Sequence, residues 1–168
     1  MASRDASPSL NTLPDGSSFK IGIVVSQWNG DITHALVEGA RETLLKAGVL
    51  ESNIEILSVP GSFELPWGAR QMMKPDKKDA IICIGCIIQG ETKHDEYIAT
   101  AVANGIMQLG LMSGIPVIFG VVTTNTVEQA KDRAGGKHGN KGAEAAAAAL
   151  QMAVVKAGEP HTRKKIGY

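Results

Sequence analysis

A cluster of polar and titratable side chains at 89–94, Gln-Gly-Glu-Thr-Lys-His, directly follows an apolar run at 81–88. Such an isoleucine-rich run is typical of a strand that is buried on both faces inside a parallel sheet. In open α/β sheets, ligands bind just beyond the carboxyl ends of the strands. Because imidazole both gives and takes protons near neutral pH, we predict that His94 transfers protons there. The alternative is an exposed surface histidine.

Three further polar turns follow predicted strands, at residues 27–29, 61–64 and 123–125. In a parallel sheet the ends of all these strands lie along one edge. We therefore expect the four turns to line a single crevice. This convergence is stronger evidence for a site than any one motif.

Several residues of these turns suit a ligand, although each also has a structural interpretation. Trp28 can stack on a flat heterocycle or cover the edge of the core. Asn29 and Glu64 can fix polar edges or hydroxyls of a ligand, although Glu64 taken alone fits better as a carboxylate at a helix N-terminus. Residues 60–62 offer backbone amides or form only a turn. Residues 90–92, just before a helix, can supply amides and a hydroxyl to a phosphate or oxyanion.

A second candidate anion site is the basic, glycine-rich segment 133–141. This segment does not fit the phosphate-binding pattern GxxxxGK[ST], which argues against binding of a nucleoside triphosphate. Binding of a phosphate or carboxylate group by Arg133 or Lys141 alone is the remaining alternative. The GxGxxG fingerprint is absent after the first strand, so NAD or FAD binding is disfavoured.

The two cysteines form a CxxC at Cys83 and Cys86, inside the predicted strand. Redox pairs of this kind normally sit at a helix N-terminus. Three positions apart on a strand, the side chains point to opposite faces, which disfavours a disulfide. Without a second Cys or His pair they also make a poor zinc site. We expect buried, reduced thiols, and no metal.

Hydrophobic spacing predicts strands alternating with helices, the pattern of a parallel sheet with helices on both faces. Asp31 is the expected N-cap of the first helix, and Gly48 its stop signal. The fold class is therefore α/β: a single three-layer α/β/α domain with a four-stranded parallel sheet, flavodoxin-like. The expected strands are 20–25, 54–59, 80–88 and 116–122, and the expected helices 32–47, 65–73, 95–112, 126–134 and 142–157.

The chain has 168 residues, which suits one domain: a flexible arm at 1–18, the main domain at 19–158 and a basic tail at 159–168. Lys plus Arg and Asp plus Glu number 17 each, which argues against nucleic-acid or membrane-surface binding driven by net charge. No apolar segment reaches the ~18 residues of a membrane span, and no secretory signal is visible. We expect a soluble, cytoplasmic protein.

The chain resembles the lumazine synthase family. The residues that carry the resemblance span most of 20–157 in the family's order: Trp28-Asn29, VPGSFE at 59–64, residues 85–94, PVIFG at 116–120, and residues 129–142 with RAGGK and GNKG. The resemblance implies that the protein condenses 5-amino-6-(D-ribitylamino)uracil with 3,4-dihydroxy-2-butanone 4-phosphate. The product would be 6,7-dimethyl-8-ribityllumazine, formed in the penultimate step of riboflavin biosynthesis, with phosphate released and no cofactor required.

The resemblance also implies roles for individual residues. Trp28, where many members have Phe, occupies the ring-stacking place beside Asn29. Ser62, Phe63 and Glu64 match the uracil and ribityl segment, with Cys86, Ile87 and Ile88 at the strand end beside it. Glu91 and Thr92 match the loop that receives the butanone phosphate, although a carboxylate at Glu91 departs from some members and would repel phosphate if it pointed inward. His94 matches the proton-transfer residue, Phe119 the second wall of the stack, Arg133 the phosphate ligand, and Lys141 a polar substrate contact.

Family members assemble as pentamers or as sixty-subunit icosahedral capsids, with Phe119 and Lys141 contributed to the neighbouring subunit's pocket. The short 135–142 connection is compatible with a capsid. One alternative is a non-catalytic flavin-binding or cage-forming shell protein, which Trp28 permits, since members with Trp there can hold riboflavin. The set of Glu64, His94 and Arg133 argues against it. Another alternative is a flavodoxin-like electron carrier, which would purify yellow with FMN.

Overall fold

A four-stranded parallel sheet forms the centre of the computed structural model, which describes residues 10, 12–74 and 76–158. The strands lie in the order β2-β1-β3-β4, so the chain reverses direction across the sheet once, between β2 and β3. This arrangement confirms the predicted flavodoxin-like α/β fold. The strands are β1 (Ile21–Ser26), β2 (Ile54–Val59), β3 (Ala80–Ile88) and β4 (Val117–Thr124).

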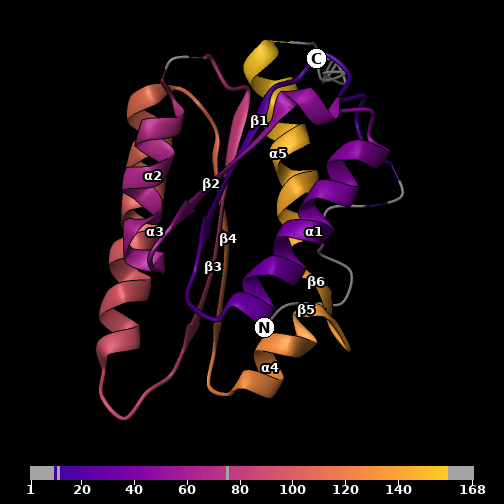
Figure 1. Cartoon of the computed structure of the whole chain (residues 1–168). Coiled ribbons are helices and arrows are strands. Elements are labelled where there is room, and N and C mark those ends of the chain that lie inside the picture. The colour runs from indigo at the N-terminus through magenta and orange to yellow at the C-terminus, as the bar shows by residue number, and fades with distance from the viewer. Residues whose placement is uncertain (1–9, 11, 75, 159–168) are drawn as a thin grey trace, which may run out of the picture.

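Helices cover both faces of this sheet and complete the predicted three layers (Figure 1). On one face α2 (Leu65–Met72) and α3 (His94–Ser113) lie side by side. On the other face α1 (Gly30–Lys46) packs against α5 (Lys141–Ala157). The short α4 (Val127–Asp132) follows β4 on that same side. Each face therefore has its own apolar core.

The central strands β1 and β3 are buried on both faces, as the isoleucine-rich sequence predicts. Along β3 the side chains alternate between the two cores. Cys86 packs in the core beneath α1 and α5, and Cys83 in the core beneath α2 and α3. The prediction that the two thiols are buried and point to opposite faces is confirmed.

Helices α1 and α5 approach each other very closely where glycines replace side chains. A Cβ on Gly142 would overlap the carbonyl oxygen of Leu36, and a Cβ on Gly39 would overlap the side chain of Asn140. Any larger residue would push the two helices apart. This contact fixes the start of α5 against the middle of α1.

Two local predictions, the start of α1 and the end of α4, need correction. Helix α1 begins at Gly30 and not at Ile32, after Asn29 in the left-handed conformation (φ 58°), so Asp31 lies in the first turn and is not the cap. Helix α4 ends at Asp132 because the glycine-rich segment turns into a small antiparallel hairpin, β5 (Ala134–Gly136) with β6 (Gly139–Asn140). Two short 3₁₀ turns, Glu51–Asn53 and Ser62–Glu64, were not predicted. The predicted stop at Gly48, with φ 91°, is confirmed.

The ends of the chain are described only in part. Residues 1–9 and 11 of the predicted arm, and the whole predicted tail at 159–168, lie outside the described residues. Within the arm, the Gly16 amide donates a hydrogen bond to the Ala47 carbonyl at 2.8 Å. Across the described ranges, no helix combines the length and apolar character that crossing a membrane requires.

Candidate active site

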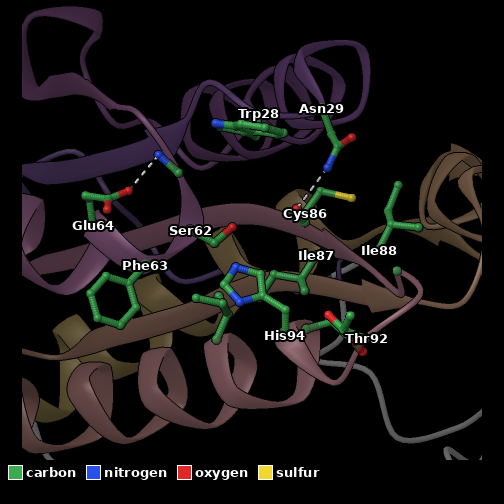
Figure 2. Close-up of a pocket in the computed structure, with 14 residues that line it drawn as sticks. Trp28, Asn29, Ser62, Phe63, Glu64, Cys86, Ile87, Ile88, Thr92 and His94 are labelled. Atoms are coloured by element: carbon green, nitrogen blue, oxygen red, sulfur yellow. Dashed lines mark hydrogen bonds between the residues drawn. The ribbon is translucent and has the colours of Figure 1, made fainter.

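A cavity of about 600 Å³ opens at the carboxyl ends of β1, β2 and β3, at the edge where the sequence predicts a ligand site. Its walls come from the turns after these three strands and from the first turns of α3 (Figure 2). A cavity of this size suits a small-molecule ligand. It is lined by Trp28, Asn29, Gly61, Ser62, Phe63, Glu64, Cys86, Ile87, Ile88, Gly90, Thr92, His94, Asp95 and Ile98.

The turn after β1 holds Trp28 over the cavity. The side-chain amide of Asn29 donates a hydrogen bond to the backbone carbonyl of Cys86 at 3.1 Å, and the Gln27 amide donates to the Val59 carbonyl at 2.9 Å. These bonds fix the turn to both neighbouring strands. Because Trp28 is 73% exposed, it does not cover the core, and its ring face is available for stacking.

The turn after β2 is closed by Glu64, whose carboxylate accepts a hydrogen bond from the Gly61 amide at 2.8 Å. The structural interpretation of Glu64 as a carboxylate at a helical start is therefore confirmed, and the same side chain also lines the cavity. Phe63 is exposed beside it, whereas Ser62 points inward and is buried. One short turn thus presents a carboxylate, an aromatic ring and a hydroxyl.

The loop after β3 leads into α3, and His94 is the first residue of that helix. Its imidazole is exposed to solvent and points into the cavity, across from Trp28 (Figure 2). Gly90 and Thr92 line the cavity, whereas Glu91 between them is exposed and does not. The free amides of a helix start favour an anion, so the proton-transfer candidate lies next to a favourable place for negative charge.

The end of β3 forms an apolar wall made by Cys86, Ile87 and Ile88. Burial raises the pKa of the Cys86 thiol to about 11. The thiol is therefore neutral near pH 7 and acts as a small apolar group, since the thiolate is the reactive form.

Three predicted site residues lie away from this cavity. Phe119 is on the edge strand β4, opposite Cys83, and faces a separate apolar hollow bounded by α3 and α5. Arg133 and Lys141 flank the β5–β6 hairpin, where the Lys141 amide donates to the Arg133 carbonyl at 2.8 Å. The Lys141 ammonium pairs with Glu144 at 3.2 Å. Within this chain, Phe119, Arg133 and Lys141 do not lie at the cavity with the other predicted site residues.

The expectation that all four polar turns line one crevice is wrong for the fourth turn. β4 is the outer strand beyond β3, and residues 123–125 do not line the cavity. The Thr124 hydroxyl donates to the Thr126 carbonyl at 2.9 Å as the chain turns toward α4, on the opposite face from α3. At the carboxyl edge of the sheet, the turns after β1, β2 and β3 therefore border the cavity, whereas the turn after β4 leads to the face opposite α3.

Two lining residues were not singled out from the sequence, Asp95 and Ile98. Ile98 lies four residues after His94 on α3, so helical periodicity places both on the same side. That spacing is a signal that could have identified Ile98. Among the residues that the structure describes, no three His, Cys, Asp or Glu side chains group closely enough to hold a metal ion.

Fold and cavity together define a flavodoxin-like α/β enzyme whose site combines an aromatic platform, an imidazole and a helix start. The family model for 6,7-dimethyl-8-ribityllumazine synthase matches residues 18–157, nearly the whole described chain. The chain therefore belongs to the 6,7-dimethyl-8-ribityllumazine synthase family. Its activity is that of a lumazine synthase in riboflavin biosynthesis.

Curated relatives agree over most of their length. A 6,7-dimethyl-8-ribityllumazine synthase of Bacteroides fragilis is 56% identical over 134 residues, which cover 80% of this chain and 94% of the relative. The enzyme of Cytophaga hutchinsonii is 52% identical over 151 residues, 90% of this chain and 95% of the relative. That of Parabacteroides distasonis is 50% identical over 143 residues, 85% and 89% of the two chains.

Proposed function

We propose that the cavity condenses 5-amino-6-(D-ribitylamino)uracil with 3,4-dihydroxy-2-butanone 4-phosphate, giving 6,7-dimethyl-8-ribityllumazine and phosphate. The observation that carries the assignment is the placement of Trp28 and His94 on opposite sides of one cavity. A flat pyrimidine needs a stacking surface, and its condensation with a ketone needs a group that moves protons. Both are available within the same cavity.

The pyrimidine stacks on Trp28, with Phe63 beside it. Its polar edges and its ribityl hydroxyls meet the amide of Asn29, the hydroxyl of Ser62 and the carboxylate of Glu64. The apolar wall at Cys86, Ile87 and Ile88 covers the remaining surface of the ring. This mixture of one large apolar surface and a few fixed polar groups is typical of a small-molecule site.

The chemistry consists of proton transfers between bound reactants. The amine of the pyrimidine attacks the ketone carbon, and water leaves to form an imine. Removal of a proton from a carbon next to the imine then leads to elimination of phosphate. The second amine attacks the remaining carbonyl carbon, and loss of a second water closes the ring of the lumazine. His94 gives and takes these protons, a role that contributes ~10²–10⁴ in rate. Orientation of the two bound reactants supplies the remaining rate enhancement.

The phosphate group of the ketone is held at the start of α3, by backbone amides near Gly90 and Thr92. Glu91 does not oppose this placement, because its side chain is exposed and does not line the cavity. Arg133 adds a cation for the phosphate, and Lys141 a polar contact. Neither lines the cavity of its own subunit, which supports a supply from a neighbouring copy.

A second copy of the chain completes each site, as in pentamers or capsids of this family. Support comes from an exposed apolar surface formed by Met107, Leu111, Met112, Phe119, Met152 and Val155. Leu111 and Met112 are 77% and 86% exposed, and side chains of this kind gather on protein–protein interfaces. Phe119 belongs to this surface, where it is free to enter a neighbour's cavity and form the second wall of the stack.

An absorbance assay tests the assignment. The purified protein is mixed with both substrates, and formation of the lumazine chromophore is followed together with release of inorganic phosphate. Equimolar production of both supports the proposal. A protein that binds riboflavin but forms neither product is instead a flavin-binding shell protein, the alternative that Trp28 permits.

A further inference from the structure

Gly61, in the turn after β2, lines the cavity next to two of its binding candidates, Trp28 and Glu64. The Gly61 amide donates a hydrogen bond to the Glu64 carboxylate at 2.8 Å, so this N–H is not available to a ligand. The Trp28 amide donates to the carbonyl of the preceding residue, Pro60, at 3.3 Å. The aromatic platform and the carboxylate of the cavity are therefore both attached to one short turn.

The backbone conformation of Gly61 does not require a glycine. Its φ of −134° and ψ of 175° are those of an extended residue, which any L-amino acid can adopt. A Cβ at Gly61 would stand 3.0 Å from the Oε2 atom of Glu64 and 3.8 Å from the Cδ1 atom of Trp28. The absence of a side chain therefore matters for the space beside these two residues, and not for conformational freedom.

The two contacts of such a Cβ would have different consequences. At 3.8 Å, a methyl group would make an ordinary van der Waals contact with the edge of the Trp28 indole. At 3.0 Å, the Glu64 carboxylate would have to move to relieve the crowding. Because the same Oε2 atom accepts the hydrogen bond from the Gly61 amide, this movement would lengthen or misalign that bond.

We propose that Gly61 is a positioning residue for the pyrimidine substrate and acts through Glu64 and Trp28. Its amide fixes the carboxylate, and its missing side chain lets the carboxylate and the indole edge border the same space. The pyrimidine stacks on Trp28 and donates hydrogen bonds to Glu64, since an ionised carboxylate only accepts them. A methyl group at Gly61 would fill part of this space and shift the acceptor relative to the stacked ring.

This inference rests on the proposed function, because it assigns the space beside Gly61 to the pyrimidine. Thr92 and His94 reach the cavity from the start of α3 and the loop before it, and not from the turn that holds Gly61. A substitution at Gly61 should therefore weaken pyrimidine binding and leave the chemical step and the binding of the ketone phosphate unchanged. A glycine needed only for folding would instead affect the stability of the protein.

The first test compares Gly61→Ala with the wild-type protein by steady-state kinetics, with each substrate varied in turn. The KM for the pyrimidine rises about 3- to 10-fold, the size of one weakened hydrogen bond, with kcat and the KM for the ketone phosphate unchanged. The unfolding midpoint stays close to that of the wild type, because an extended backbone accepts alanine. Gly30→Ala is the matched control, since its Cβ would stand 3.7 Å from the nearest atom, in His34, and Gly30 does not line the cavity.

A double-mutant cycle tests whether Gly61 acts through Glu64. In a Glu64→Ala background the crowded oxygen is absent, so Gly61→Ala raises the KM for the pyrimidine less than it does in the wild type. An equal rise in both backgrounds overturns the inference. So does an unchanged KM for the pyrimidine in Gly61→Ala, or an equal rise in both KM values. Loss of the folding transition in Gly61→Ala also overturns it, because Gly61 would then be a structural glycine.

Calorimetric titration of the pyrimidine alone, under anaerobic conditions, separates this inference from the proposed function. If the wild-type protein binds the pyrimidine but forms no lumazine, the proposed function fails, and weaker binding by Gly61→Ala still supports the role of Gly61. If the wild-type protein forms lumazine and Gly61→Ala binds the pyrimidine equally well, only the role of Gly61 fails.

Discussion

The side-chain amide of Asn140 donates a hydrogen bond to the backbone carbonyl of Ala35 at 2.9 Å, which ties the start of α5 to α1. The other end of the same side chain accepts bonds from the amides of Gly142 and Ala143, at 2.9 and 3.2 Å. One residue therefore caps α5 and joins it to its neighbour. Because Lys141 is adjacent to Asn140, this contact also sets where the hairpin presents Lys141.

Substitution of Asn140 separates its two roles. Asn140→Asp keeps the oxygen that caps α5 but loses the donor to Ala35, so we expect a loss of about 1 kcal/mol in the free energy of unfolding. Asn140→Ala loses both roles and is expected to lose about 2 kcal/mol. Guanidinium unfolding of the three proteins checks the order. Equal stability of the Asp and Ala variants would show that the donor to Ala35 carries the whole effect.

His94→Ala lowers kcat by ~10²–10⁴, with the folding transition and the KM values largely unchanged, because the imidazole moves protons and does not hold the ring. The matched control is His34→Ala, which removes an exposed histidine on α1 outside the cavity. Stopped-flow absorbance of lumazine formation gives both rates. Normal turnover in His94→Ala would remove the residue from its assigned role.

Arg133→Ala raises the KM for the ketone phosphate about tenfold and leaves the KM for the pyrimidine nearly unchanged, since one charge-assisted contact to phosphate is lost. Arg70→Ala, an exposed arginine in the last turn of α2, is the control for a general loss of positive charge. Kinetics with each substrate varied in turn distinguish the two. A similar rise in both KM values would contradict the phosphate assignment.

Complementation between inactive variants tests whether Phe119 acts on a neighbouring subunit. His94→Ala and Phe119→Ala are co-expressed, so that mixed assemblies contain both. If each site takes His94 from one subunit and Phe119 from the next, random mixing in equal amounts restores about one quarter of wild-type sites. Activity no higher than the average of the two single variants would place both residues in the same subunit's site.

The thiol of Cys83 makes stability depend on alkaline pH. Burial raises its pKa to about 12, whereas the thiol of an unfolded chain titrates near ~8.5. Below that lower pKa both states hold the proton and no difference arises. As the pH rises further, the unfolded chain loses the proton first, so stability falls toward pH 12.

Between pH 8 and pH 10, the wild-type protein should lose about 1–2 kcal/mol more stability than Cys83→Ala, which lacks this thiol. Unfolding curves at both pH values measure the difference. An equal pH dependence in the two proteins would show that Cys83 ionises freely in the folded state.

Much of the fold could be predicted from sequence because its central elements are strongly patterned. The bounds predicted for β2 and β3 match the structure, because Pro60 directly follows β2 and the polar segment that starts at Gln89 directly follows the apolar β3. The hairpin formed by β5 and β6 could not be predicted in this way. Residues 134–140 include three glycines and no apolar alternation that would indicate a strand, and the two strands pair only with each other.

The candidate site also contains parts that could be predicted from the sequence and parts that could not. Residues directly after β1, β2 and β3 were placed together correctly, because parallel strands bring their ends to one edge. The turn after β4 was placed wrongly, because the side of the sheet to which the chain turns depends on tertiary packing.

The exposure of Trp28 also makes the protein a natural optical probe. The chain contains two tryptophans, and the second, Trp67, lies on the outer surface of α2 and does not line the cavity. With Trp67 replaced by phenylalanine, all indole emission would come from the ring that faces the ligand. Binding of a ligand in the cavity would then change the fluorescence of Trp28, so that occupancy could be measured before any product is formed.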